Sequence, residues 1–247
     1  MGLKPDKTID KSEMRKTFGG IFDSRTIMNL ISLLKRGQIK NLGGIAKEGK
    51  ESKILSADGK EGPVAVKIYL IESLNFKRIQ PYLRGDRRFA SIGNDKKRII
   101  YAWCKKEFKN LSIARAAGVL CPEPKAFAGN VLVEEFIGED FSPAPRLADI
   151  REFDAEKVFD FVLNSMKKLF SAGLVHGDLS EYNILLWKEQ PWIIDFSQAV
   201  LLSHPNAEEF LQRDVKNVCN FFRKRGLGLE EENILAEIKK SSKEKII

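Results

Sequence analysis

The sequence lacks the features of membrane-spanning and secreted proteins. Within the chain, no run approaches the roughly 18 to 20 consecutive apolar residues that a membrane-spanning helix needs. Residues 1–7 are polar and no apolar stretch follows them, which does not fit a secretory signal. The only three cysteines, Cys104, Cys121 and Cys219, lie far apart and predict free thiols in a reducing compartment. We therefore expect a cytoplasmic protein without a membrane partner.

Histidine is also scarce, with only His176 and His204 in the chain. Because the scattered cysteines form no Cys-x-x-Cys pair, a metal site built from histidine and cysteine is not expected. What is present is an ordinary globular composition, with 43% hydrophobic and 31% charged residues. A chain of 247 residues buries a sizeable core without help from disulfides or metals.

Positive charge is concentrated in one segment, residues 77–109, which we call the basic block. It contains eleven Lys and Arg residues and only three acids, an excess as large as the net charge of +8 of the whole chain. Such a block predicts contact with nucleic acid or another polyanion. On charge alone, a solvated helix face and a loop explain it equally well.

The predicted elements make the first half of the chain rich in strands. Helices are expected at about 24–36 and 96–117, and strands within 39–57, at 64–70 and at 131–137. Residues 85–95 contain turn residues and charges with no clear period, and we expect a flexible loop there.

The second half is expected to be mostly helical. A long helix follows Asp154, two short strands are expected at 184–187 and 192–195, and helix resumes at about 208. The breaker sequence Gly-Glu-Asp at 138–140 indicates a hinge between the two halves. The predicted organisation is an N-terminal extension at 1–22, an N-lobe at 23–137 and a C-lobe at 138–247. The predicted fold class is α+β.

The strongest chemical signal is the sequence HGDLSEYN at residues 176–183. An Asp followed five residues later by Asn, and preceded by His, matches the catalytic loop of protein kinases. Asp178 would accept a proton from, or orient, the attacking hydroxyl, and Asn183 would offer a neutral oxygen to a metal. Taken alone, each is more often a loop residue that makes turn hydrogen bonds.

A second acid follows at a fixed distance. Twelve residues after Asn183, Asp195 ends the apolar stretch Trp-Ile-Ile and is followed by Phe196. A carboxylate there would hold Mg²⁺ across the β- and γ-phosphates of a nucleotide. Asp178, Asn183 and Asp195 in this order favour phosphoryl transfer strongly over three unrelated loop residues.

Lys67 and Glu107 form a predicted ion pair. The run Val-Ala-Val-Lys ending at Lys67 resembles the strand that supplies the phosphate-binding lysine of a kinase. Its partner should be an acid near the middle of the next long helix, and Glu107 is so placed. An edge-strand charge and a solvated helix residue are the plainer alternatives.

A competing motif lies at residues 44–50, which fit the P-loop pattern G-x-x-x-x-G-K. The next residue should be Ser or Thr but is Glu51, and the following segment is strand-like, so no helix N-terminus would face the phosphates. We reject that fold. The same residues suit a β-hairpin loop that folds over a nucleotide, with Gly49, Lys50 and Ser52 at the phosphates.

Together these motifs resemble the RIO family of atypical serine/threonine protein kinases, over roughly residues 23–225. The resemblance rests on sequence motifs in both halves: GKES at 49–52, VKIY at 66–69, YLRGDRRF at 82–89, WCKKEFKNL at 103–111, EFIG at 135–138, HGDLSEYN at 176–183, IDFSQAV at 194–200 and HP at 204–205. The YLRGD stretch is similar to the subfamily that lacks an N-terminal winged helix. The short stretch before the first predicted helix agrees with that subfamily.

The resemblance implies a two-lobed, protein-kinase-like fold that binds ATP with Mg²⁺ or Mn²⁺ between its lobes. It further implies a role in maturation of the small ribosomal subunit, with the basic block contacting rRNA. Backbone groups of Glu135 and Ile137 are expected to meet adenine. Only 52 residues follow Asp195, which predicts a truncated C-terminal lobe without an activation segment.

One departure concerns the base pocket. Glu134 occupies the position before the hinge where an apolar residue is expected, and a carboxylate there is costly unless it is paired. Two other functions stay open beside an ATP-dependent Ser/Thr kinase or ATPase. They are a small-molecule kinase of the aminoglycoside or choline type, and a nucleotide-dependent RNA-binding switch.

Overall fold

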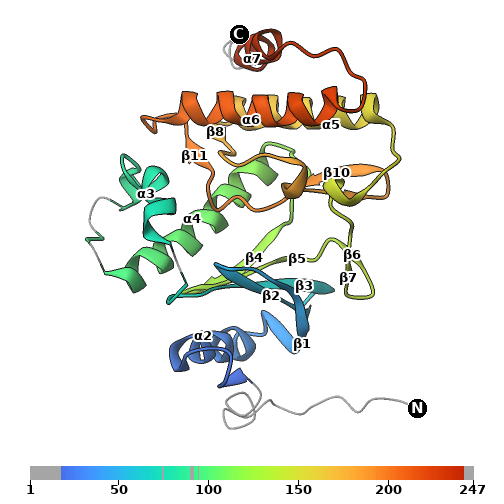
Figure 1. Cartoon of the computed structure of the whole chain (residues 1–247). Helices are drawn as coiled ribbons and strands as arrows, with labels where there is room; N and C mark the ends of the chain where they lie inside the picture. The colour runs from blue at the N-terminus through green and yellow to red at the C-terminus, as the bar shows by residue number, and fades with distance from the viewer. Residues whose placement is uncertain (1–17, 74, 90–91, 94, 242–247) are drawn as a thin grey trace.

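The computed structural model describes residues 18–73, 75–89, 92–93 and 95–241. Most of the predicted N-terminal extension, and parts of the predicted loop at 85–95, lie outside the described residues. The first described helix, α2 (Ser24–Lys35), begins as expected, because the Asp23 carboxylate accepts hydrogen bonds from the amides of Arg25 and Thr26. It packs Leu30 and other apolar residues against one face of a sheet (Figure 1).

That sheet is antiparallel and has the strand order β1-β2-β3-β5-β4. Its strands are β1 (Ile39–Glu48), β2 (Ser52–Gly59), β3 (Pro63–Tyr69), β4 (Pro124–Ala128) and β5 (Val131–Glu135). The rejection of a P-loop fold is confirmed, because residues 44–51 lie in the β1–β2 hairpin and no helix begins there.

The basic block is more ordered than expected. A helix that the sequence did not predict, α3 (Phe76–Leu83), precedes a short 3-10 turn at Arg87–Phe89. Its short length of eight residues and Pro81 within it made this helix hard to predict from the sequence. The long helix α4 (Lys96–Ala116) agrees with the prediction and crosses between the sheet and the C-terminal helices (Figure 1).

The second half contains three helices and short strand pairs. The helices are α5 (Ala155–Ser171), α6 (Ala207–Arg223) and α7 (Glu231–Lys240). The strand pairs are β6 (Gly138–Glu139) with β7 (Ser142–Pro143), β8 (Leu174–Val175) with β11 (Val200–Leu201), and β9 (Ile184–Trp187) with β10 (Gln190–Ile193).

One predicted boundary in this half was wrong, and one predicted helical stretch is divided. The strand expected at 192–195 is β10, which ends two residues earlier, because Asp195 has a left-handed backbone with φ of 63° that extended pairing cannot accommodate. The helical stretch expected from about 208 divides into α6 and α7.

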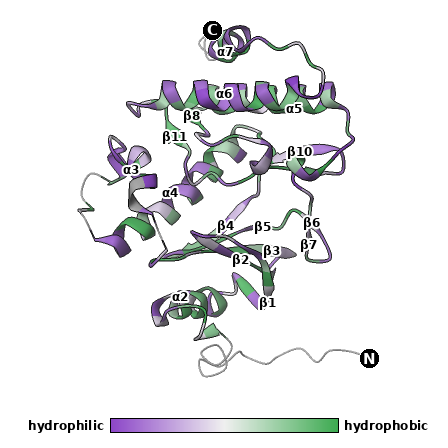
Figure 2. Ribbon diagram, in the orientation of Figure 1, coloured by the Kyte–Doolittle hydropathy of each residue, from purple (hydrophilic) through white to green (hydrophobic). Residues whose placement is uncertain are grey.

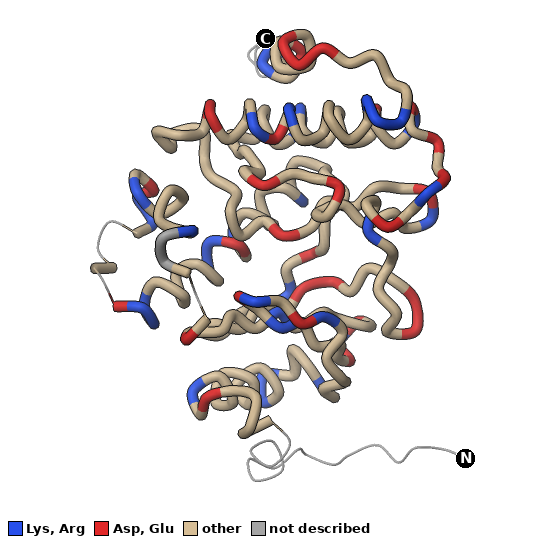
Figure 3. Tube along the Cα trace, in the orientation of Figure 1, with Lys and Arg blue, Asp and Glu red and all other residues tan. Residues whose placement is uncertain are grey.

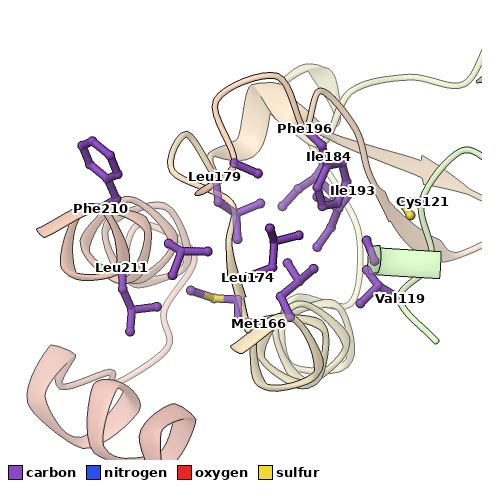
Figure 4. Packing of buried hydrophobic residues seen from close by; sticks show 14 of the residues in the cluster. Val119, Cys121, Met166, Leu174, Leu179, Ile184, Ile193, Phe196, Phe210 and Leu211 are labelled. Carbon is purple, nitrogen blue, oxygen red and sulfur yellow. The ribbon is translucent and has the colours of Figure 1, made fainter. Parts of the chain in front are cut away.

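The larger hydrophobic core joins α4, α5 and α6 to the short strands of the second half (Figure 4). Figure 4 shows Leu174 and Met166 at the centre of this packing, with Leu179, Ile184 and Ile193 beside them and Phe210 and Leu211 on the neighbouring helix. Figure 2 shows the same division, with hydrophobic ribbon turned inward and hydrophilic ribbon outward on α5 and α6. None of the helices in the described ranges is long and apolar enough to cross a membrane.

Candidate active site

A cavity of about 420 Å³ lies between the five-stranded sheet and the second half of the chain. Seven of the predicted site residues line it: Gly49, Ser52, Lys67, Glu135, Ile137, Asn183 and Asp195. Three do not line it: Lys50, Glu107 and Asp178. The cavity therefore collects residues from β1–β3, the hinge and the loops around β9 and β10.

Lys67 is the central cation of this cavity. Its Nζ lies 2.7 Å from Oε1 of Glu107 on α4 and 2.9 Å from Oδ1 of Asp195, so the expected ion pair with Glu107 is present. Glu107 also accepts a hydrogen bond from the hydroxyl of Tyr69. Burial alone would lower the pKa of Lys67, but the carboxylates of Asp195 and Glu107 outweigh it and raise that pKa. The lysine is therefore held charged at the wall of the cavity.

Asn183 and Asp195 are placed side by side by a backbone hydrogen bond of 2.9 Å from the amide of Ile194 to the carbonyl of Asn183. Lys67 Nζ and Ser197 Oγ both donate to Oδ1 of Asp195. Within the described part of the chain, no hydrogen bond reaches Oδ2 of Asp195 or Oδ1 of Asn183. Burial alone would raise the pKa of Asp195. The positive charge and hydrogen bond of Lys67 outweigh burial and hold the pKa of Asp195 well below its usual range.

This pair fits a magnesium ion. Mg²⁺ prefers oxygen ligands and is usually held by one or two carboxylates together with phosphate oxygens rather than by a cage made wholly of protein. The two free oxygens of Asn183 and Asp195 are of that kind. No cluster of three or more His, Cys, Asp or Glu able to hold a metal occurs among the described residues.

Asp178 lies just beyond the cavity and is connected to it through Asn183. The side-chain amide of Asn183 donates to the carbonyl of Asp178 over 2.8 Å, and the amide of Gln198 donates to Oδ2 of Asp178 over 3.0 Å. Burial and then the negative charge of Asp195 raise the pKa of Asp178 to about 6. Asp178 is thus a base that is ionised at neutral pH and fixed in orientation by two amides.

Two residues that the sequence did not single out hold the catalytic loop. Asp214 on α6 is buried and accepts hydrogen bonds from the amides of Gly177 (2.7 Å) and Leu179 (2.8 Å), on both sides of Asp178. Arg213 donates to the hydroxyl of Tyr82 on α3 and to the carbonyl of Gly177. The only signal was the place of these charged residues on an amphipathic helix, and that placement is also typical of a solvated face.

His176 has a structural position in the same loop. It is buried, packs edge-to-face on Phe196 with 4.8 Å between ring centroids, and its Nε2 lies 3.1 Å from the carbonyl of Ile194. Burial lowers its pKa to about 4, so the ring is neutral at physiological pH. It ties the catalytic loop to the segment that carries Asp195.

Residues 135–137, which we call the hinge segment, offer only some of their backbone groups to a base. The amide of Glu135 donates to the carbonyl of Glu123, so only the carbonyl of Glu135 can serve. The carbonyl of Ile137 accepts a hydrogen bond from the amide of Ala144 over 2.9 Å. The amide of Ile137 is therefore the backbone group at this residue that can bond to a base. Among the described residues, that amide has no hydrogen-bond partner.

Glu134 is buried at the inner end of this hinge, and it lines the cavity. No hydrogen bond reaches its carboxyl from any residue that the structure describes. Burial, and then the negative charge of Glu107, raise its pKa to about 8. The sequence indicated that a buried carboxylate at this position would be unfavourable. Because its pKa is raised, Glu134 keeps its proton at neutral pH and is buried as a neutral carboxylic acid.

The proton on Glu134 makes stability depend on pH. Folded, the residue keeps its proton up to about pH 8, whereas its ordinary pKa is 4.5, so unfolding releases a proton between these values. We therefore expect Glu134→Met to raise the free energy of unfolding, by about 1 to 3 kcal/mol at pH 8 and by less at pH 5. Urea unfolding at both pH values measures this, and an equal gain at both would contradict it.

Comparisons with known proteins identify the family of the chain. The model of the RIO domain family matches residues 53–234. The chain is 41% identical over 239 residues to the RIO-type serine/threonine-protein kinase Rio1 of Haloferax volcanii, covering 94% of this chain and 82% of that protein. It is 43% identical over 212 residues to the protein of the same name from Methanocaldococcus jannaschii, covering 85% of this chain and 72% of the relative.

A solved structure described as the Rio2 kinase–ADP/Mg²⁺–phosphoaspartate complex from Chaetomium thermophilum superimposes with a TM-score of 0.66 at 25% identity. The match covers 85% of this chain and 65% of the Rio2 chain. The predicted α+β, kinase-like fold is thereby confirmed. Its truncated second lobe is confirmed as well, since only residues 196–206 connect Asp195 to α6. The chain therefore belongs to the RIO family of serine/threonine protein kinases.

Proposed function

We propose that the chain binds ATP with Mg²⁺, or Mn²⁺ in its place, in the cavity, and transfers the γ-phosphoryl group to a Ser or Thr hydroxyl or to water. The observation that carries this is the ammonium of Lys67, held between Glu107 and Asp195 at the wall where Asn183 offers a second free oxygen. A fixed cation and two oxygen ligands are what a triphosphate and its metal ion require.

The residues divide the work as follows. Lys67 binds the phosphates, and Asn183 and Asp195 would hold the metal ion, which when bound neutralises charge on the β- and γ-phosphates. Asp178 orients the attacking hydroxyl or water and accepts its proton, since its pKa of about 6 leaves it ionised at neutral pH. Asp214 keeps Asp178 in place through the backbone amides beside it.

Membership of the RIO family favours this activity over a small-molecule kinase. Labelled ATP offered with Mg²⁺, with Mn²⁺ or with EDTA, and with protein hydroxyls, small alcohols or small-subunit precursor particles as acceptors, tests it. We expect metal-dependent turnover and no transfer to small alcohols. A protein that fails to bind ATP in the presence of Mg²⁺ would contradict the proposed function.

We further propose that the partner is the pre-ribosomal small subunit, contacted through rRNA by the basic block, and that the protein works in the cytoplasm. The three cysteines, all free and buried, support a reducing compartment. Figure 3 displays blue segments along α3 and at the start of α4. Exposed cations here include Arg84, Arg87 and Arg98.

Two cations of the basic block have internal roles instead. Arg88 makes a bidentate pair with Asp86 and donates to Oδ1 of Asn110 over 2.8 Å. Lys106 is buried and donates to the carbonyl of Ser197 over 2.8 Å. Arg88 stabilises the turn after α3, and Lys106 stabilises the segment after Asp195. Fewer of the eleven Lys and Arg residues of the basic block are therefore available to contact RNA than the sequence alone suggests.

Replacing Arg84, Arg87, Lys96 and Arg98 by Gln is expected to weaken rRNA binding and to flatten its dependence on salt. Each phosphate contact that is lost removes roughly 0.9 from the slope of log affinity against log salt, taking the duplex DNA value as a guide. Binding of a small-subunit rRNA fragment at several salt concentrations measures the slope.

A matched variant controls for net charge. It changes four of the exposed lysines outside the basic block: Lys40, Lys60, Lys188 and Lys224. Their replacement by Gln removes the same charge and should leave the slope nearly unchanged. If both variants flatten the slope equally, the basic block is only part of a diffuse positive field.

A further inference from the structure

Glu134 supplies a polar group in the part of the cavity where a nucleotide base would lie. It stands opposite Ala65 in the pairing of β5 with β3, and both residues line the cavity together with Lys67. The next residues along the chain are the hinge, where the Glu135 carbonyl and the Ile137 amide remain available. The carboxyl of Glu134 therefore sits at the inner end of the base-binding wall, between the hinge and the phosphate-binding lysine.

This carboxyl has hydrogen-bonding capacity that the protein does not use. The residue is only 8% exposed, yet its carboxyl has no hydrogen-bond partner in the part of the chain that the structure describes. The charged groups that act on it are Glu107, Lys67 and Asp195, and Lys67 is already paired with both acids. Because Glu134 lines the cavity, a bound ligand can reach this largely buried carboxyl, and its unused hydrogen-bonding capacity points to a partner that arrives with the substrate.

The chemistry of that partner follows from the hinge, and here the inference rests on the proposed binding of ATP in this cavity. A carbonyl followed by an amide is complementary to the amino group and N1 of adenine. A base held in that way turns its second amino hydrogen and its N7 away from the hinge, toward the inner wall. On the inner wall next to the hinge, Glu134 supplies the carboxyl.

We propose that Glu134 is a base-reading residue, whose carboxyl oxygen accepts a hydrogen bond from the amino group of adenine and thereby selects ATP against GTP. Guanine has a carbonyl oxygen at that position, so two acceptors would face each other. When it carries a proton, the carboxyl has one acceptor oxygen and one O–H donor. The acceptor can meet the amino group of adenine and the donor can meet N7, as the two ends of a Gln amide do. Guanine offers two acceptors on this edge and can satisfy only the donor.

A role at the phosphate end is the competing explanation. If Glu134 acted only by placing Lys67, its removal would change the affinity for every nucleoside triphosphate by the same factor, because the phosphates are identical. Ratios of affinities between bases separate the two roles. Nucleotides altered at one position of the base assign the contact to an atom.

The experiment measures the dissociation constants of ATP, GTP, purine riboside triphosphate, which lacks the amino group, and 7-deaza-ATP, which lacks N7. They are measured for the unmodified chain, Glu134→Met and Glu134→Gln, with Mg²⁺ present. In Glu134→Met, we expect the preference for ATP over GTP, and over purine riboside triphosphate, to fall on the order of tenfold, the worth of one buried hydrogen bond. In Glu134→Gln, the preference over purine riboside triphosphate is restored, because Gln keeps an acceptor oxygen.

The control is Glu61→Gln, which removes an exposed acid in the turn between β2 and β3, outside the cavity lining, and should change no ratio. Unchanged ratios in Glu134→Met, with ATP still bound by the unmodified chain, overturn the base-reading role alone. Failure of the unmodified chain to bind ATP overturns the proposed function itself. A loss of affinity that is equal for all four nucleotides assigns Glu134 to the lysine and likewise overturns the base-reading role.

Discussion

Replacing Asp178 with Asn should lower the turnover of ATP by about 10²- to 10⁴-fold while leaving the affinity for ATP nearly unchanged. The proposed role of this carboxylate is to accept the proton of the nucleophile, and the neutral amide of Asn cannot accept it. Affinity is preserved because Asp178 does not line the cavity, whereas Lys67 and the hinge do. Steady-state turnover and direct ATP binding, measured on the same preparation, separate the two effects.

The pH profile gives an independent readout of the same group. Because the pKa of Asp178 is raised to about 6, turnover by the unmodified chain should fall as the pH drops through that value, as the base takes up its proton. The residual activity of Asp178→Asn should lack this fall. Asp160→Asn, a change of the same kind at an exposed position on α5, should behave like the unmodified chain. Near-normal turnover by Asp178→Asn would remove Asp178 from the mechanism.

Some of the predicted site residues are close together in the sequence, and others are far apart. Asp178 and Asn183 lie in one tight loop, so the spacing that chemistry requires is visible as a spacing of letters. Lys67 and Glu107 are forty residues apart, and their pairing came from resemblance to kinases rather than from any local pattern. The contact of 2.7 Å confirms that pairing.

The residues that the sequence did not reveal act through tertiary contacts. Asp214 reaches the catalytic loop only because α6 packs beside it, and an acid on a helix is usually solvated. Gln198 was part of a recognised motif, but its bond to Asp178 depends on how the chain turns after Asp195. The helix α3 escaped prediction because its position depends on packing, with Tyr82 stacked on Phe210 at 4.8 Å between ring centroids.

Asp195 is expected to become phosphorylated. Its Oδ2 accepts no hydrogen bond among the described residues, and Asp195 lines the cavity in which the triphosphate is proposed to bind. In the reaction, the carboxylate oxygen attacks the γ-phosphorus, the bond to the leaving oxygen breaks, and ADP departs. Water then cleaves the acyl phosphate to inorganic phosphate and restores the carboxylate. ATP would in this way serve mainly as a switch, with the aspartyl phosphate marking one of its states.

Hydroxylamine distinguishes this species, because at neutral pH it cleaves an acyl phosphate and leaves a phosphoserine intact. After incubation with γ-labelled ATP and Mg²⁺, the denatured chain should carry a label that hydroxylamine removes. Asp195→Asn should carry none of it. Asp178→Asn should retain it, because the group that activates water for its breakdown is missing. A label that survives hydroxylamine completely, or a hydroxylamine-labile label on Asp195→Asn, would place the phosphoryl group elsewhere and leave Asp195 only its role toward the metal ion.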